Sequence, residues 1–155
     1  MKGPLFYSKI LLFGEYGIIE DSKGLSIPYN FFNGALKFSK GETKDSKKSN
    51  KILLKFHKYL YEIHDLHLDL GKFEKDLSEG IYFDSSIPQG YGVGSSGAIV
   101  AAVYDKYALN KIKISENLNR KKLVDLRNIF SKMESFFHGK SSGLDPLNSY
   151  LSIPI

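Results

Sequence analysis

The chain has 155 residues, 42% of them hydrophobic and 25% charged, which is the composition of an ordinary globular domain and not of a disordered segment. The absence of cysteine excludes a disulfide framework and a thiolate metal site, and no apolar run approaches the roughly 20 residues that cross a bilayer. The N-terminus also lacks the apolar stretch and cleavage site of a signal peptide, so we expect a cytoplasmic protein.

The formal net charge of +5 allows nucleic acid, acidic lipid or phosphorylated metabolites as partners. Much of the excess lies in residues 37–58, which are rich in lysine and poor in arginine. No aromatic RNA-binding signature accompanies these lysines, so a solvated lysine face is favoured over a nucleic-acid groove.

The first part of the chain has the pattern of strands followed by a polar segment. Strands are predicted at residues 5–13, 24–29 and 35–39. Residues 10–13 are four consecutive apolar residues, which favours a strand that is buried on both faces. Residues 30–34 have turn chemistry, and the polar residues 40–50 are expected to form a mobile loop.

The rest of the chain alternates helical patterns with one short strand. Helices are predicted at residues 51–64, 70–79, 98–108 and 121–137, with a further short helix capped by residues 115–117 and a strand at residues 81–84. The helix at residues 121–137 is amphipathic, with apolar side chains recurring on one side.

A glycine-rich stretch, IPQGYGVGSSGA, lies between the strand at residues 81–84 and the following helix. Its small residues are Gly90, Gly92, Gly94, Ser95, Ser96 and Gly97. A glycine-rich turn that leads into a helix points free backbone N–H groups at one spot, which favours a phosphate. The stretch has neither the Walker pattern nor a dinucleotide fingerprint. A flexible turn with a serine N-cap is therefore the alternative.

A second glycine and serine turn, HGKSSGLDP, contains one carboxylate, Asp145. Taken singly, each charged residue near these turns has an ordinary structural explanation. Lys9 could extend to a strand edge, Glu134 could face solvent, and Asp145 could cap a helix or close a turn. His138 by itself is more typical of a packed or capping histidine.

Three stretches, SKILLFGEYGII, IPQGYGVGSSGAIVAA and MESFFHGKSSGLD, occur in this order along the chain. Together they resemble the first two motifs and the catalytic loop of the GHMP kinases, and within that family the mevalonate kinases most of all. The resemblance spans residues 7–145. It implies an α+β fold in two layers, in which a mixed sheet is backed by helices on one side, like the family's N-terminal domain with its ribosomal-protein domain-2-like fold.

The resemblance also implies a role for each group of residues. The glycine loop would hold the phosphates of ATP, and Ser96 with Glu134 would bind Mg²⁺, although the sequence leaves open whether Ser95 or Ser96 takes the metal. Asp145 would accept the proton of the substrate hydroxyl or orient that hydroxyl, and Lys9 would keep Asp145 ionised. The remaining motif residues, expected on the substrate side or supporting the site, are Glu15, Tyr16 and His138.

Departures from the family pattern are mild within the motifs. Tyr16 replaces a histidine, Val93 a leucine and Gly97 an alanine. A larger departure is the third glycine-rich motif, which family members carry in a C-terminal lobe that residues 1–155 do not contain. We therefore expect an N-terminal ATP-binding domain at residues 1–155 that folds but turns over little or no substrate alone, and needs that lobe in cis or in trans.

The expected function is ATP-dependent phosphorylation of a metabolite hydroxyl, with mevalonate, in isoprenoid precursor synthesis, as the best single candidate. Other GHMP kinase substrates, such as phosphomevalonate, homoserine or a sugar, stay open, and so does a homodimer. Two different classes of function also stay open: a non-catalytic lobe that binds a partner subunit, and an RNA-binding module, since the chain is basic and the implied fold resembles a ribosomal domain.

Overall fold

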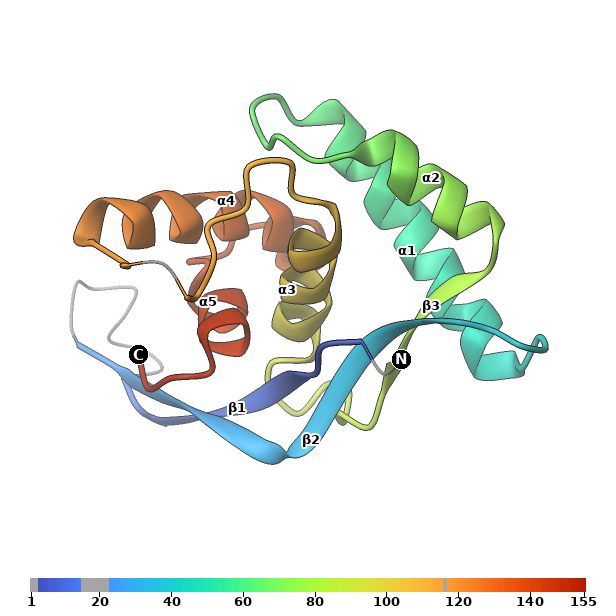
Figure 1. Ribbon diagram of the computed structural model, residues 1–155. Coiled ribbons are helices and arrows are strands. Elements are labelled where there is room, and N and C mark those ends of the chain that lie inside the picture. The colour runs from blue at the N-terminus through green and yellow to red at the C-terminus, as the bar shows by residue number, and fades with distance from the viewer. Residues whose placement is uncertain (1–2, 15–22, 116) are drawn as a thin grey trace.

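The computed structural model describes residues 3–14, 23–115 and 117–155. Its elements in chain order are β1 (Phe6–Phe13), β2 (Leu25–Phe38), α1 (Lys44–Glu62), α2 (Leu70–Ser78), β3 (Ile81–Ser85), α3 (Ser95–Tyr107), α4 (Arg120–His138) and α5 (Leu144–Leu151). Figure 1 shows the sheet as one layer and the helices together on one side of it. The α+β class with helices backing one face is therefore confirmed.

The sheet has the strand order β1-β2-β3, and both of these strand pairs are antiparallel. The prediction of a mixed sheet is thus wrong for the described strands. The two strands predicted at residues 24–29 and 35–39 form one continuous strand, β2. A bulge replaces the predicted turn, because Tyr7 pairs with Asn33 while the next residue, Ser8, pairs with Tyr29. The bulge bends β2, and its second half pairs with β3.

The end of β1 is not buried on both faces, contrary to the expectation from its apolar run. Leu12 is 53% exposed and Phe13 is 57% exposed. The reason is visible in Figure 1, where the helices cover one face of the sheet and leave the other bare. An apolar run alone does not reveal how many layers cover a strand.

Residues 44–50 belong to α1 and not to a mobile loop, which corrects the prediction for this segment. Thr43 caps the helix: its side chain accepts a hydrogen bond from the Ser46 N–H, and the Ser46 side chain accepts one from the Thr43 N–H. This reciprocal capping allows the helix to begin in a lysine-rich stretch that lacks apolar periodicity. The predicted helix at residues 70–79 is confirmed as α2, which follows its cap Asp69.

The core centres on α3, whose residues from Gly97 to Tyr104 are all buried. The small residues early in α3 let it pack closely beneath the neighbouring helices. The long helix predicted at residues 121–137 is confirmed as α4. The short helix predicted after residues 115–117 is absent from the described residues there, because the helix cap is Asn119, at the start of α4. In the described part of the chain, no helix has the length and apolarity to cross a membrane.

Candidate active site

The glycine loop places a helix N-terminus at the centre of the site. Gly90, Gly92 and Gly94 all have positive φ angles, of 81°, 67° and 83°. Gly94 is the N-cap of α3 and offers no side chain to bond the first N–H groups of the helix. These N–H groups and the positive end of the helix dipole therefore face the space beside the loop, where an anion would be stabilised. Ser95 and Ser96 occupy the first turn of α3, as predicted.

Strand β1 brings Lys9 against this loop. The Lys9 backbone N–H donates a hydrogen bond to the Val93 carbonyl, with an N–O distance of 2.9 Å. A Cβ atom at Gly94 would lie 2.9 Å from the Lys9 Cγ atom, so glycine is needed there both for space and for its positive φ. The Lys9 residue is 7% exposed. The loop and the strand therefore fix the lysine stem between them.

Helix α5 carries Asp145, the carboxylate that pairs with Lys9. The Lys9 Nζ atom lies 3.1 Å from the Asp145 Oδ1 atom, and the side chains of the two residues are 9% and 35% exposed, respectively. The pair joins a covered ammonium to a partly open carboxylate. Asp145 also lines the cleft described below, so its exposed part faces space that a ligand can enter.

Gly97 lets α3 and α5 approach closely enough for this pairing. A Cβ atom at Gly97 would lie 2.8 Å from the Asp145 carbonyl carbon and 2.9 Å from the Pro146 nitrogen. Both atoms belong to the backbone at the start of α5. The replacement of the family's alanine by Gly97 thus has a steric counterpart, a direct backbone contact between the two helices.

Glu134 on α4 forms the other half of the site. Its side-chain Oε1 atom accepts a hydrogen bond from the Ser96 hydroxyl at 3.1 Å, and its Oε2 atom accepts one from the Ser141 hydroxyl. The His138 Nε2 atom lies 2.8 Å from the Ser96 hydroxyl oxygen. Because the hydroxyl has one proton and donates it to Glu134, it accepts from the Nε2–H tautomer of His138.

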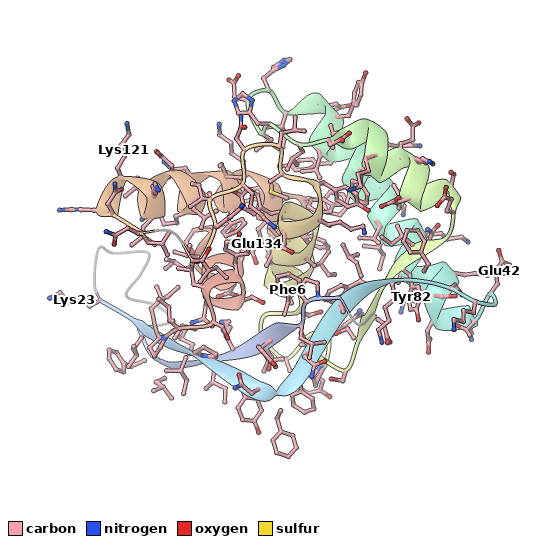
Figure 2. The ribbon with its side chains drawn as sticks, in the orientation of Figure 1. Phe6, Lys23, Glu42, Tyr82, Lys121 and Glu134 are labelled. Atoms are coloured by element: carbon pink, nitrogen blue, oxygen red, sulfur yellow. The ribbon has the colours of Figure 1, made fainter. Side chains whose placement is uncertain are left out.

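Glu134 is 3% exposed, and Figure 2 places it in the interior, whereas Lys23, Glu42 and Lys121 extend outward. Burial raises the pKa of the Glu134 carboxyl above its ordinary value, and the negative charge of Asp145 raises it further. Hydrogen bonds from Ser141 and Ser96 and the proximity of His138 lower the pKa, but burial is the largest effect. A cation bound here would remove this penalty.

A cleft of about 580 Å³ opens above these groups. One part is polar and includes the glycine loop, Ser96, His138 and Asp145, while another part is apolar and includes Ile52, Phe136 and Phe137. A second cavity of about 350 Å³ adjoins it, with Ile52, Gln89, Ser95 and Ile99 in both walls. The combination of amide donors, paired charges and an apolar wall is suited to a phosphorylated organic ligand.

The model of the GHMP kinase N-terminal domain family matches residues 52–152, which is more than half of the chain. The chain belongs to the GHMP kinases. Membership indicates a kinase, that is, an ATP-binding transferase, at the level of the family. No curated protein sequence matches the chain. The matched region of this GHMP kinase chain includes Ser96, Glu134 and Asp145 and excludes Lys9, which only the folded chain brings to them.

GHMP kinases generally use ATP with Mg²⁺, and the donor set of this chain fits such an ion. The described residues contain no cluster of three or more histidine, cysteine or acidic side chains that could hold a metal by itself. Mg²⁺ usually takes one or two protein oxygens and completes its shell with phosphate oxygens and water. The hydrogen-bonded oxygens of Ser96 and Glu134 meet that requirement.

The structure brings together most of the predicted site residues of this GHMP kinase chain. Lys9, Asp145, Ser96 and Glu134 converge on the glycine loop, and His138 joins them through Ser96. The two substrate-side candidates Glu15 and Tyr16 lie outside the described residues. Ser141, which donates to Glu134, was not predicted from the sequence, although its place in the second glycine and serine turn was a usable signal. Phe136 and Phe137 were not predicted as site residues either; the amphipathic pattern of the helix assigns Phe137 to its apolar side, while both line the cleft.

Proposed function

We propose that this chain is the ATP-binding lobe of a kinase that phosphorylates the hydroxyl group of a small metabolite. The observation that carries the proposal is the Lys9–Asp145 ion pair at 3.1 Å, held beside a glycine loop at the start of α3. An ordinary surface ion pair would not have a 9% exposed lysine side chain locked against a phosphate-binding type of turn.

Each group then has a part in phosphoryl transfer, which depends on alignment and on charge balance more than on covalent chemistry. The N–H groups of residues 94–97 hold the phosphate chain. Asp145 accepts the proton of the acceptor hydroxyl or orients that hydroxyl for attack on the terminal phosphorus. The Lys9 ammonium keeps Asp145 ionised and stabilises the developing alkoxide. Ser96 and Glu134 would hold Mg²⁺, which supplies neutralising charge for the phosphates.

Mevalonate is the acceptor that we propose, with phosphomevalonate as the product, in isoprenoid precursor synthesis. Support comes from the similarity of the three motifs to those of mevalonate kinases. Phosphomevalonate, homoserine and a sugar are the alternative acceptors, because the apolar wall of Ile52, Phe136 and Phe137 does not by itself select among them.

The test is a coupled ADP-release screen of mevalonate, phosphomevalonate, homoserine and galactose, with a kinase in which this chain is joined to a C-terminal lobe. We expect release of ADP that depends on mevalonate. Turnover with one of the other three and none with mevalonate would reject mevalonate but retain the kinase assignment. Absence of ADP release with all four would contradict the proposed class of acceptor.

Catalysis by residues 1–155 without that lobe is expected to be slow or absent, because Asp145 lies in an open cleft and water competes with the acceptor there. The same assay on the isolated chain checks this point. Steady phosphorylation of mevalonate by the isolated chain would show that no second lobe is needed.

A further inference from the structure

The cleft above the glycine loop has almost no spare positive charge for a polyanionic ligand. Among the described residues that line it, Lys55 is the single lysine or arginine side chain. Lys9 lies next to the cleft, but its ammonium is already paired with Asp145. Glu134 adds a further buried acid close by. Among the described residues, a nucleoside triphosphate in this cleft would therefore meet amide dipoles, the Asp145 carboxylate with Glu134 buried nearby, and one lysine without a carboxylate partner.

Lys55 differs in position from the other lysines of its helix. Lys44, Lys48, Lys51, Lys55 and Lys58 follow one another at intervals of four and three residues, which places them along one stripe of α1. All five are exposed. Only Lys55 lines the larger cleft, and Lys48 lines the adjoining cavity. In the part of the chain that the structure describes, no carboxylate forms an ion pair with Lys55.

The residues that share the cleft wall with Lys55 affect how strongly its charge would interact with a phosphate. Ile52, Phe136 and Phe137 line the same cleft, so Lys55 shares its wall with apolar side chains. A charge in such surroundings interacts more strongly with a nearby phosphate than one that is fully solvated. The glycine loop, which precedes α3, lines the same cleft as Lys55 of α1. A ligand in this cleft can therefore contact the loop amides and Lys55 at the same time.

We propose that Lys55 binds the phosphate chain of the nucleotide from the α1 side of the cleft, in addition to the amides of the glycine loop. This inference rests on the proposed function and adds a specificity-determining residue to it. Lys55 supplies the charge that distinguishes a nucleotide with several phosphates from one with a single phosphate. The lysines at positions 51 and 58 have no part in binding, since neither lines a cavity described above.

The experiment compares Lys55→Met with Lys51→Met and Lys58→Met in the 155-residue chain. Methionine matches the unbranched apolar stem of lysine in length and removes the charge. Isothermal titration with ATP, ADP and AMP, each with Mg²⁺, measures Kd, and circular dichroism checks the fold. We expect Lys55→Met to raise the Kd for ATP about tenfold, as for loss of one charge-assisted hydrogen bond, and to change the Kd for AMP about twofold or less. Lys51→Met and Lys58→Met should leave both Kd values near those of the unaltered chain.

Three outcomes would overturn the inference, and they are distinguishable from one another. An unchanged ATP affinity in Lys55→Met would reject Lys55 as a contact while ATP binding, and with it the proposed function, stands. Equal weakening in all three variants would assign the effect to the general field of the lysine stripe. Failure of the unaltered chain to bind ATP would reject the proposed function and the inference together.

Discussion

Lys9 and Asp145 illustrate at the scale of single residues how an ordinary ion pair becomes a candidate reactive centre. The ammonium is covered, because the glycine loop and the strand enclose the lysine stem, whereas the carboxylate is partly open to the cleft. A substrate hydroxyl can therefore reach Asp145 but not displace Lys9. This difference in exposure suits a carboxylate that accepts a proton from a ligand while a fixed ammonium keeps it ionised.

Asp145→Asn is expected to lower kcat about 10²–10⁴-fold while ATP affinity changes little, because the amide cannot accept a proton but occupies the same space. Lys9→Met should also lower kcat, since Asp145 then loses its partner. The measurement is steady-state kinetics of the kinase that contains this chain and a C-terminal lobe. Asp105→Asn is the matched control, because Asp105 forms a 2.8 Å pair with Lys111 elsewhere in the fold. A near-normal kcat for Asp145→Asn would remove that residue from the reaction.

The buried carboxyl of Glu134 should make the free energy of unfolding depend on pH when metal and nucleotide are absent. Burial raises its folded-state pKa above the ordinary value of 4.5, so the unfolded chain releases this proton at a lower pH than the folded chain does. The contribution of this proton to stability is full below about pH 4.5 and is lost as the pH rises through the folded-state pKa. Ionisation of Glu134 therefore lowers the stability of the fold at neutral pH relative to its protonated form.

Glu134→Gln is thus expected to raise the free energy of unfolding at pH 7 by about 1 kcal/mol, and the gain should shrink as the pH approaches 4.5. Urea unfolding of both proteins across that pH range, with a chelator present, measures the difference. Glu74→Gln on the exposed side of α2 is the control and should show no such trend. A stability difference between Glu134→Gln and the unaltered chain that did not vary with pH would exclude burial of the charge as its cause.

At the scale of elements, the site depends on the contact between α3 and α5. Helix α3 supplies Ser96 and the N–H groups that we propose to bind phosphate, while α5 supplies Asp145. Their backbones meet at Gly97, where no side chain intervenes. A methyl group at position 97 would therefore push apart the start of α3 and the segment that carries Asp145.

Gly97→Ala tests this contact. Alanine favours the helix by about 1 kcal/mol, but its Cβ atom would lie 2.8 Å from the Asp145 carbonyl carbon, and the start of α5 must move. We expect a net loss of about 1–2 kcal/mol in urea unfolding, and a fall in kcat that exceeds any change in ATP affinity. Gly71→Ala in α2 is the control, because its Cβ would meet only Asp69 Oδ1, at 3.8 Å. Equal effects of the two substitutions would show that the α3–α5 contact is not tight.

At the scale of the whole molecule, the site draws on elements from both ends of the chain. Strand β1 and helix α5 are the first and last described elements, and the Lys9–Asp145 pair and a hydrogen bond from the Ser149 hydroxyl to the Tyr7 carbonyl join them. Figure 1 shows α5 beside α3, between α4 and β1. A ligand in the cleft is in contact with α1, α3, α4 and α5 together, so its binding is coupled to global unfolding.

Addition of ATP with Mg²⁺ is therefore expected to raise the thermal midpoint of the chain. At about 100 times its Kd, a ligand that binds only the folded state adds about 2.7 kcal/mol, which corresponds to about 5–10 °C for a chain of this size. Differential scanning fluorimetry measures the shift, with Mg²⁺ alone as the control. Equal midpoints with and without ATP at saturating concentration would contradict nucleotide binding at this cleft.

Local patterns in the sequence were enough to predict the family, the glycine loop and most of the candidate site residues that the fold brings together. Glycines that lead into a helix, and a helix marked by apolar periodicity, require only neighbours along the chain. The start of α1 was missed because a capping box, and not periodicity, begins that helix. The helix α5 was missed because it begins at Leu144, directly after a glycine and serine turn that gave no apolar periodicity.

Which of these groups lie in contact depends on the packing of the folded chain. The pairing of Lys9 with Asp145, the contact of His138 with Ser96 and the position of Lys55 on the cleft wall all join segments that are distant in sequence. The exposed end of β1 and the antiparallel sheet were likewise decided there. The physical reason is the same in each case: burial and contact depend on which elements pack together, and packing is a property of the whole chain.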